Sequence, residues 1–163
     1  TGPDRVRVGG IKGKPRPDTI KLCVGYHKGW KTVSMLSFAW PDAYEKAQYC
    51  AEIIMKKMHR RGMKADDVHI SYIALNSLHL GVADMSEETL KRLNECVLRI
   101  AVFSEDKKEC AKIIPEISPL QLNGPPGASF FGGRAHVQEV MALWPTTVPR
   151  DALKIESHIL EVK

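Results

Sequence analysis

A glycine-rich segment in the C-terminal half contains the first residues whose types suggest chemistry. Asn123 to Gly133 reads NGPPGASFFGG and is followed by Arg134 and His136. Glycines let a backbone approach a ligand closely, and successive exposed N–H groups can surround an anion. The guanidinium of Arg134 would add a donor that suits a phosphate or a carboxylate. The residues expected to bind such an anion are Asn123, Gly124, Gly127, Gly132, Gly133 and Arg134.

A long turn that binds nothing is the alternative for this segment. Its glycines match neither the dinucleotide fingerprint after a strand nor the phosphate-binding loop with its lysine. Binding residues are nevertheless frequent on loops that a rigid scaffold holds in place. Both interpretations therefore stay open at the level of the sequence.

A second candidate site follows a strand-like stretch at residues 68–75, where the chain reads Asn76-Ser77-Leu78-His79. His79 could act as a general base, and Ser77 as a nucleophile or a hydrogen-bond donor. No third member of a catalytic triad is identifiable, since Asp84 is only a neighbour in sequence. The alternative is a turn in which Asn76 and Ser77 satisfy backbone groups.

A third candidate is the stretch Tyr26-His27-Lys28-Gly29-Trp30. Residues 19–27 alternate between apolar and polar, Lys28-Gly29 suits a tight turn, and residues 31–39 read as a returning strand. The pair therefore predicts a hairpin with Tyr26 and His27 near its tip, where they could bind a ligand. Exposed aromatic residues at such a tip are also typical of contacts with a partner protein.

Cysteine and histidine spacing argues against a metal site. Four cysteines are far apart without a C-x-x-C pair, and six histidines form no cluster with them. This pattern predicts reduced thiols, no bound metal and a cytoplasmic location. No apolar stretch approaches the ~20 residues of a membrane span.

The net charge of +5 is mild, and most basic residues are scattered. One cluster lies at residues 56–64, where cations would suit the end of a helix. Because no stacking aromatic residues accompany this cluster, the sequence argues against nucleic-acid binding.

The elements that must position these residues follow a recognisable order. A strong helical repeat begins at Pro41 and ends before Gly62. Ser86 and Ser104 are suited to begin shorter helices, and strands are expected at residues 68–75, 96–103 and 137–143. From Lys31 onward the order is strand, helix, strand, strand, helix, strand, which is the ferredoxin-like split βαβ order of an α+β fold. We expect an antiparallel sheet with helices on one face, extended by the hairpin strand at 19–27.

The ends of the chain suggest a piece of a longer polypeptide. Residues 1–18 combine a short strand at Arg5–Val8 with a Gly/Pro linker, and residues 19–163 are expected to form one α+β domain. The chain begins with Thr1 rather than methionine. A nucleophilic N-terminal threonine is an alternative, although no base lies nearby in sequence. Pro145 and Pro149 are expected to bound a turn, and residues 155–162 to form a last strand.

Several motifs together resemble one family. They are Gly13-Lys14-Pro15-Arg16-Pro17, Val24-Gly25-Tyr26 with Gly29, Asn76 to His79, Asn123-Gly124-Pro125 and Val148-Pro149-Arg150. With them the chain resembles the later portion of the acyclic terpene utilisation (AtuA-like) family. The resemblance implies a role in acyl-CoA or carboxylic acid catabolism, with a coenzyme A thioester among the substrates to consider.

Two functions are compatible with these observations. The first is an enzyme subunit or fragment that acts on an acyl-CoA or related carboxylate, with an anion at the glycine-rich segment and His79 near the chemistry. The second is a non-catalytic assembly domain for a larger partner chain, or for a missing N-terminal region. Both imply an oligomer, and neither identifies a cofactor.

Overall fold

The computed structural model of the chain describes residues 2–79, 81–154 and 156–162. It divides into two compact units, one made of Thr1–Tyr26 with Leu143–Lys163 and the other of His27–Ala142. Two long strands, β1 (Thr19–Ala39) and β5 (Val137–Pro149), have residues in both units. The domain boundary expected at residue 18 stays a prediction.

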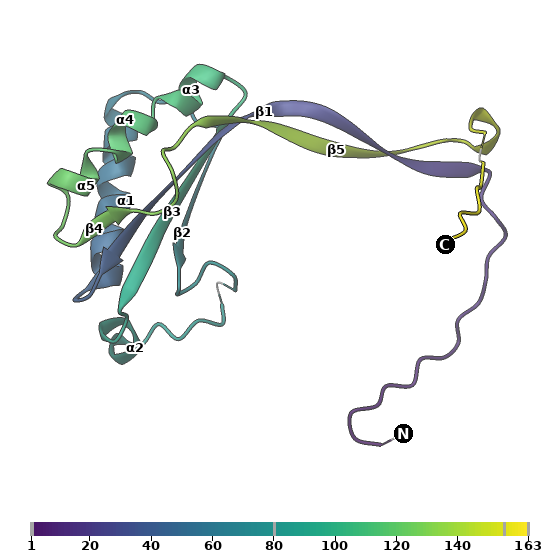
Figure 1. Cartoon of the computed structure of the whole chain (residues 1–163), viewed down its shortest axis with the longest axis horizontal. Helices are drawn as coiled ribbons and strands as arrows, with labels where there is room; N and C mark the ends of the chain where they lie inside the picture. The colour runs from purple at the N-terminus through teal and green to yellow at the C-terminus, as the bar shows by residue number, and fades with distance from the viewer. Residues whose placement is uncertain (1, 80, 155, 163) are drawn as a thin grey trace. The chain divides into compact units, whose positions relative to one another are not determined.

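The sheet contains β1, β2 (Asp67–Ile73), β3 (Glu95–Ser104) and β4 (Ala128–Phe130) in the order β2-β3-β1-β4, and β5 also pairs with β1. The pairings of β3 with β1 and β2, and of β4 with β1, are antiparallel. β1 and β2 therefore run parallel, with β3 between them (Figure 1). This is the split βαβ arrangement, so the predicted α+β, ferredoxin-like fold is confirmed.

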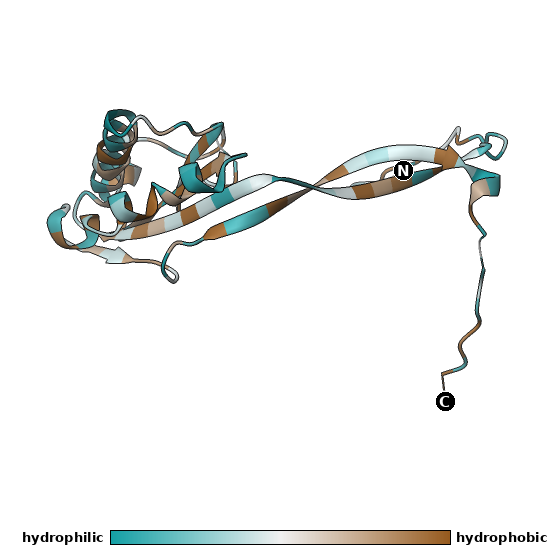
Figure 2. Cartoon of the chain, turned by 90° about the horizontal axis from the view of Figure 1, so that it is seen from above, coloured by the Kyte–Doolittle hydropathy of each residue, from teal (hydrophilic) through white to brown (hydrophobic). Residues whose placement is uncertain are grey.

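The helices gather on one face of this sheet, as Figures 1 and 2 show. The long helix α1 (Ala43–Arg60) connects β1 to β2, and the short α2 (Glu87–Lys91) precedes β3. The connection from β3 to β4 contains three short helices, which are α3 (Lys107–Ala111), α4 (Ile114–Ile117) and α5 (Leu120–Asn123). A single 3-10 turn, η1 (Arg150–Ala152), follows β5.

Helix α1 forms where its apolar residues repeat at helical spacing. The buried stripe consists of Ala43, Tyr44, Ala47, Cys50, Ala51, Ile54 and Met58. Basic residues in its last turn suit the negative end of the helix dipole. Gly62 follows the helix with φ of 57°, the left-handed conformation of a C′ glycine. Pro41 lies before the N-cap residue Asp42 rather than in the first turn, so the helix begins slightly later than expected.

The sheet face beneath α1 is apolar because alternate strand residues share one side. Leu36 of β1 lies opposite Leu98 of β3, and Ile70 of β2 lies opposite Ile100. Phe38, Cys96 and Val102 belong to the same buried cluster, together with Ile113, Ile117 and Leu120 from the connection after β3. The core of the His27–Ala142 unit therefore lies between the sheet and its helices.

The predicted hairpin at residues 19–39 is wrong, because these residues form one continuous strand. Gly29 serves a close approach between strands instead of a turn. A Cβ atom added to it would lie 2.9 Å from the carbonyl oxygen of Ser104, and its φ is 154°. Tyr26 and His27 consequently lie within a strand and not at a hairpin tip.

The glycine-rich segment is not a plain loop either, because it contains strand β4. Ser129 pairs with Ser37 of β1, and the Ala39 backbone N–H donates to the Gly127 carbonyl at 3.2 Å. Gly127 has φ of 82°, which favours glycine as the chain enters the strand. The segment escaped prediction as a strand because its pairing partner is about ninety residues away in sequence.

Smaller corrections concern the ends of the chain. Residues 5–8 form no strand, and neither do residues 156–162, while Ile155 and Thr1 lie outside the described residues. Pro145 lies inside β5 and does not bound a turn. β2 ends at Ile73 instead of residue 75, and the helix after β3 is capped by Asp106, whose carboxylate accepts from the Lys108 N–H at 2.8 Å.

The linker before β1 contacts the end of β5 within its own unit. Arg150 donates from its backbone N–H to the Asp18 carbonyl at 2.8 Å and from Nε to the Pro17 carbonyl at 3.0 Å. In the part of the chain that the structure describes, no helix is both long and apolar enough to cross a lipid bilayer.

Candidate functional site

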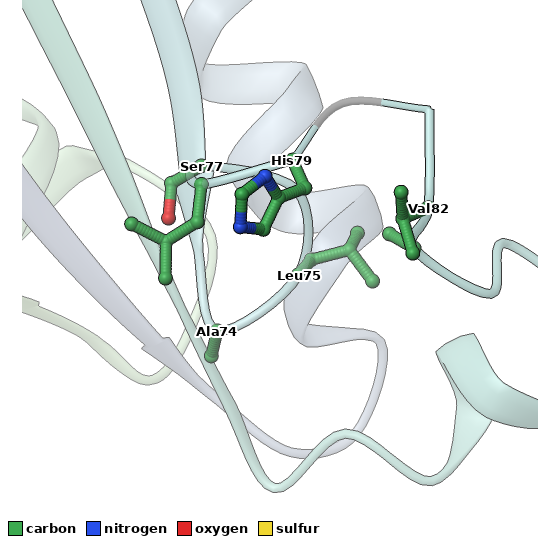
Figure 3. Close-up of a pocket in the computed structure, with 7 residues that line it drawn as sticks. Ala74, Leu75, Ser77, His79 and Val82 are labelled. Atoms are coloured by element: carbon green, nitrogen blue, oxygen red, sulfur yellow. The ribbon is translucent and has the colours of Figure 1, made fainter. Parts of the chain in front are cut away.

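Ser77 and His79 line a pocket of about 370 Å³ at the end of β2. Figure 3 shows the group, which comes from the end of that strand and the loop that follows it. The other lining residues are Ala74, Leu75, Leu78, Val82 and Ala83. Ala74 has φ of 78°, an uncommon conformation for a residue other than glycine. The pocket thus combines one hydroxyl and one imidazole with mainly apolar walls.

Asp84 has a structural role that removes it from a triad with these residues. Its carboxylate accepts the Ser86 backbone N–H at 2.9 Å and the hydroxyl of Thr89. These bonds hold the start of α2, and they lower the pKa of Asp84, the hydrogen bond from Thr89 having the largest effect. Ser77 and His79 therefore supply a hydroxyl and a base to their pocket without an orienting carboxylate from Asp84.

Asn123 and Gly124 line a different and larger pocket, of about 520 Å³, on the side of α1. Helix α1 contributes Glu45, Lys46, Tyr49 and Ile53, and Pro125 completes the lining. The ammonium group of Lys46 also donates to the Ala39 carbonyl at 3.1 Å. A cation, a phenol and an amide thus reach one cavity whose size suits a small ligand.

Three of the four glycines in the segment, Gly124, Gly127 and Gly132, have structural reasons that are independent of a ligand. Gly124 follows the last residue of α5, and a Cβ atom there would collide with the carbonyl oxygen of Leu120 in that helix. Gly132 has φ of 78°, and a Cβ atom there would lie 3.4 Å from the Met35 methyl group. Gly133 and Arg134 are exposed beyond β4 and are not among the residues that line the pocket of Asn123.

Tyr26 and His27 have different aromatic neighbours. The Tyr26 ring meets Trp144 edge to face, with centroids 6.3 Å apart, and belongs with it to the smaller unit. The His27 ring meets Trp30 at 5.2 Å in the larger unit. Neither residue lines the pocket of Ser77 or that of Asn123.

Part of the basic cluster at the end of α1 is paired with acidic groups. The buried carboxylate of Glu116 on α4 lies 2.6 Å from Arg61 Nε and 3.6 Å from Lys57 Nζ. Glu109 accepts from the Lys64 backbone N–H, and a hydrogen bond from Lys112 is the main reason that its pKa is lowered. These contacts favour a structural role for Lys57 and Arg61 at the helix end.

The cysteines are free thiols, with Cys50, Cys96 and Cys110 buried and Cys23 exposed. Burial raises the pKa of Cys50 and of Cys96 to about 11. Within residues 2–79, 81–154 and 156–162, no three side chains of His, Cys, Asp or Glu converge in a way that could hold a metal ion.

The architecture defines the class of protein as a split βαβ α+β domain whose surface has pockets of ligand size. The sequence matches the model of the family described as "Acyclic terpene utilisation family protein AtuA" over residues 1–159. The chain therefore belongs to the AtuA family, and the resemblance seen in its motifs is confirmed. A search of curated proteins finds no match to this chain.

Sequence reasoning missed Lys46 and Tyr49 as candidate site residues. Both lie outside the buried stripe of α1, and their spacing of three places them on one helix face. Their spacing was the one signal in the sequence that could have indicated a shared site. It does not indicate which other segment of the chain faces these two residues. Only the return of the chain through α5 brings Asn123 to the same pocket.

Proposed function

We propose that this chain provides a carboxylate-binding site to a protein that acts in the breakdown of carboxylic acids. The observation that supports the proposal is the pocket where Lys46, Tyr49 and Asn123 meet. A carboxylate could accept from the ammonium, the phenol and the amide together. Ile53 and Pro125 would contact the hydrocarbon part of the same ligand.

The charges around this pocket favour one negative charge on the ligand. Glu45 belongs to the lining beside Lys46, so the cavity has one cation and one anion of its own. A group with several negative charges, such as the phosphates of coenzyme A, would meet repulsion from Glu45. We therefore infer a free carboxylate as the occupant.

Ser77 and His79 enter the proposal as candidates for catalysis at their own pocket. His79 would transfer a proton, and Ser77 would act as nucleophile or donor. Leu75, Leu78 and Val82 surround them with apolar surface suited to a hydrocarbon chain.

The binding proposal is tested by titrating the chain with 3-methylbutanoate and, separately, with its coenzyme A thioester, using calorimetry. Lys46→Gln should weaken binding of the carboxylate at least about tenfold, or about 1.4 kcal/mol. Lys56→Gln is the matched control, since Lys56 lies on the same helix outside this pocket. Equal affinity in the two variants, or no binding by the unchanged chain, would refute the proposal.

An assembly domain is the second candidate, and the smaller unit favours it. Val24 and Tyr26 of β1 and Leu143 and Trp144 of β5 are all exposed apolar or aromatic side chains. A two-stranded ribbon is at best marginally stable in water on its own. A larger partner chain, or a region of the same polypeptide outside this sequence, would stabilise the ribbon by covering these side chains. If the chain without substitutions binds neither the carboxylate nor the thioester but binds such a partner, the result would support the assembly function instead.

A further inference from the structure

The two edges of the main sheet differ in how well they are protected. β4 is three residues long and follows two prolines, so it offers little backbone to a second strand. β2 lies at the opposite end of the strand order, and among the described residues its pairing partner is β3. Its seven residues, DVHISYI, contain no proline, and their only charged residue is the aspartate at the start. An edge of this kind presents unpaired N–H and C=O groups that another strand can use.

A groove of about 370 Å³ accompanies this edge on the helix side of the sheet. It lies between α1 and β2, and its walls combine apolar residues with one acid and one base. The Met55 side chain is 38% exposed there, although it is large and apolar. The lining residues are Gln48, Ala51, Glu52, Met55, Lys56, Ile70 and Tyr72.

We propose that β2 and the α1 groove form a two-fold interface in which β2 of a second copy of this chain pairs antiparallel with β2. Paired about Ile70, the strand is complementary to itself. Val68 would lie opposite Tyr72 of the second copy, which is a favourable β-branched and aromatic pair. Asp67 would lie opposite Ile73 of the second copy, so no like charges meet.

The charges of the groove also suit a second copy. Glu52 and Lys56 form an ion pair of 3.5 Å on α1, with Lys56 70% and Glu52 64% exposed. A two-fold axis at Ile70 reverses the direction of the second α1 relative to the first. Glu52 then faces Lys56 of the second copy, and Lys56 faces Glu52. An unrelated peptide would need to reproduce both the strand and this charge pattern, whereas a second copy has them by symmetry.

Sedimentation of the 163-residue chain over a range of concentrations tests the interface. The weight-average mass should rise from that of one chain to that of two. Glu52→Lys and Lys56→Glu, each made alone, place like charges across the axis and should raise the dissociation constant at least about tenfold. The double exchange E52K/K56E restores opposite charges and should return the constant to within about threefold of the original.

The control exchange is Glu87→Lys on α2. Glu87 forms an ion pair with Lys91 at the same i,i+4 spacing, and both side chains are exposed. Glu87→Lys changes the net charge by the same amount as Glu52→Lys. It should leave the dissociation constant of the dimer unchanged. Circular dichroism verifies that each variant is folded.

Hydrogen exchange supplies a second readout, because β2 amides should gain protection as concentration rises. A chain that stays monomeric at every concentration overturns the proposal. So does a dimer that Glu52→Lys and Glu87→Lys weaken equally, or one that the double exchange fails to restore. The outcome is independent of carboxylate binding, since Lys46 and Asn123 line another pocket.

Discussion

Several residues that the sequence suggests as binding or catalytic groups instead have a structural role, in which they fit or bond the backbone. Gly124 avoids the Leu120 carbonyl, and Gly127 adopts a left-handed conformation before β4. Asp84 holds the start of α2. The residues that keep a chemical interpretation are those whose polar groups reach a pocket, which are Lys46 and Asn123 at one site and Ser77 and His79 at another.

The cysteines give the first prediction, which concerns their reactivity. At pH 8, one thiol per folded chain should react rapidly with a disulfide reagent, because Cys23 is exposed while the other three are buried. The raised pKa values also suppress the thiolate of Cys50 and Cys96. All four should react in denaturant. Cys23→Ser should abolish the rapid reaction, and rapid loss of more than one thiol would contradict the burial.

The same thiols give the stability of the fold a pH dependence. Burial raises the pKa of Cys50 and Cys96 from the ordinary 9.0 to about 11. The folded state therefore retains protons that the unfolded state loses between these values. The stabilisation is fully present below pH 9 and disappears as the pH rises toward about 11. Urea midpoints measured at pH 8 and pH 10 should show the decrease, which would be smaller in a Cys50→Ala variant.

At the scale of elements, the continuity of β1 has the largest consequence. The strand pairs with β3 over Trp30–Ala39 and with β4 at its end, so it forms the centre of the sheet. A turn at Lys28-Gly29 would have ended the strand just before Trp30, where its pairing with β3 begins. Gly29 instead permits the strand to pass close to the Ser104 carbonyl.

Substitution of this glycine gives the third prediction. Gly29→Ala should destabilise the fold by about 1–3 kcal/mol, because the new methyl group meets backbone and the φ angle is unfavourable. Gly25→Ala is the matched control in the same strand, since the space around it is open, and it should change stability by less than about 0.5 kcal/mol. Urea denaturation followed by circular dichroism measures both. If the two substitutions changed the free energy of unfolding equally, the close approach at Gly29 would not contribute to stability.

At the scale of the whole molecule, burial is distributed unequally between the two units. The core cluster runs from Leu36 to Leu120, so all its members belong to the His27–Ala142 unit. The smaller unit combines part of β1 and β5 with exposed apolar side chains. Its local stability must therefore come from strand pairing and from whatever covers those side chains.

Hydrogen exchange gives the fourth prediction. In the isolated chain, amides of residues 19–26 and 143–149 should exchange at least about a thousandfold faster than those of β3, because local opening costs little where no core is disrupted. Mass spectrometry of peptides from both regions makes the comparison. If residues 19–26 and 143–149 were protected from exchange as strongly as β3, the result would contradict the unequal distribution of burial between the two units. A partner that covers the ribbon should raise its protection selectively.

The sequence by itself determined the elements that local periodicity encodes. The helical stripe from Ala43 to Met58 and the alternation from Cys96 to Val102 specify α1 and β3, because each buries one face whatever its partner. The order of these elements was enough to indicate the split βαβ sheet, and five short motifs were enough to indicate the family.

The tertiary structure alone decided features that depend on distant partners. Gly29 has the chemistry of a turn residue, and only the long-range pairing that keeps β1 continuous on both sides of it makes it part of a strand. Ala128 to Phe130 have no repeat of their own and become β4 through β1. Lys46 and Asn123 are far apart in sequence and meet because α5 returns the chain to α1. Such contacts arise from long-range pairing and packing, which a local pattern of residues does not encode.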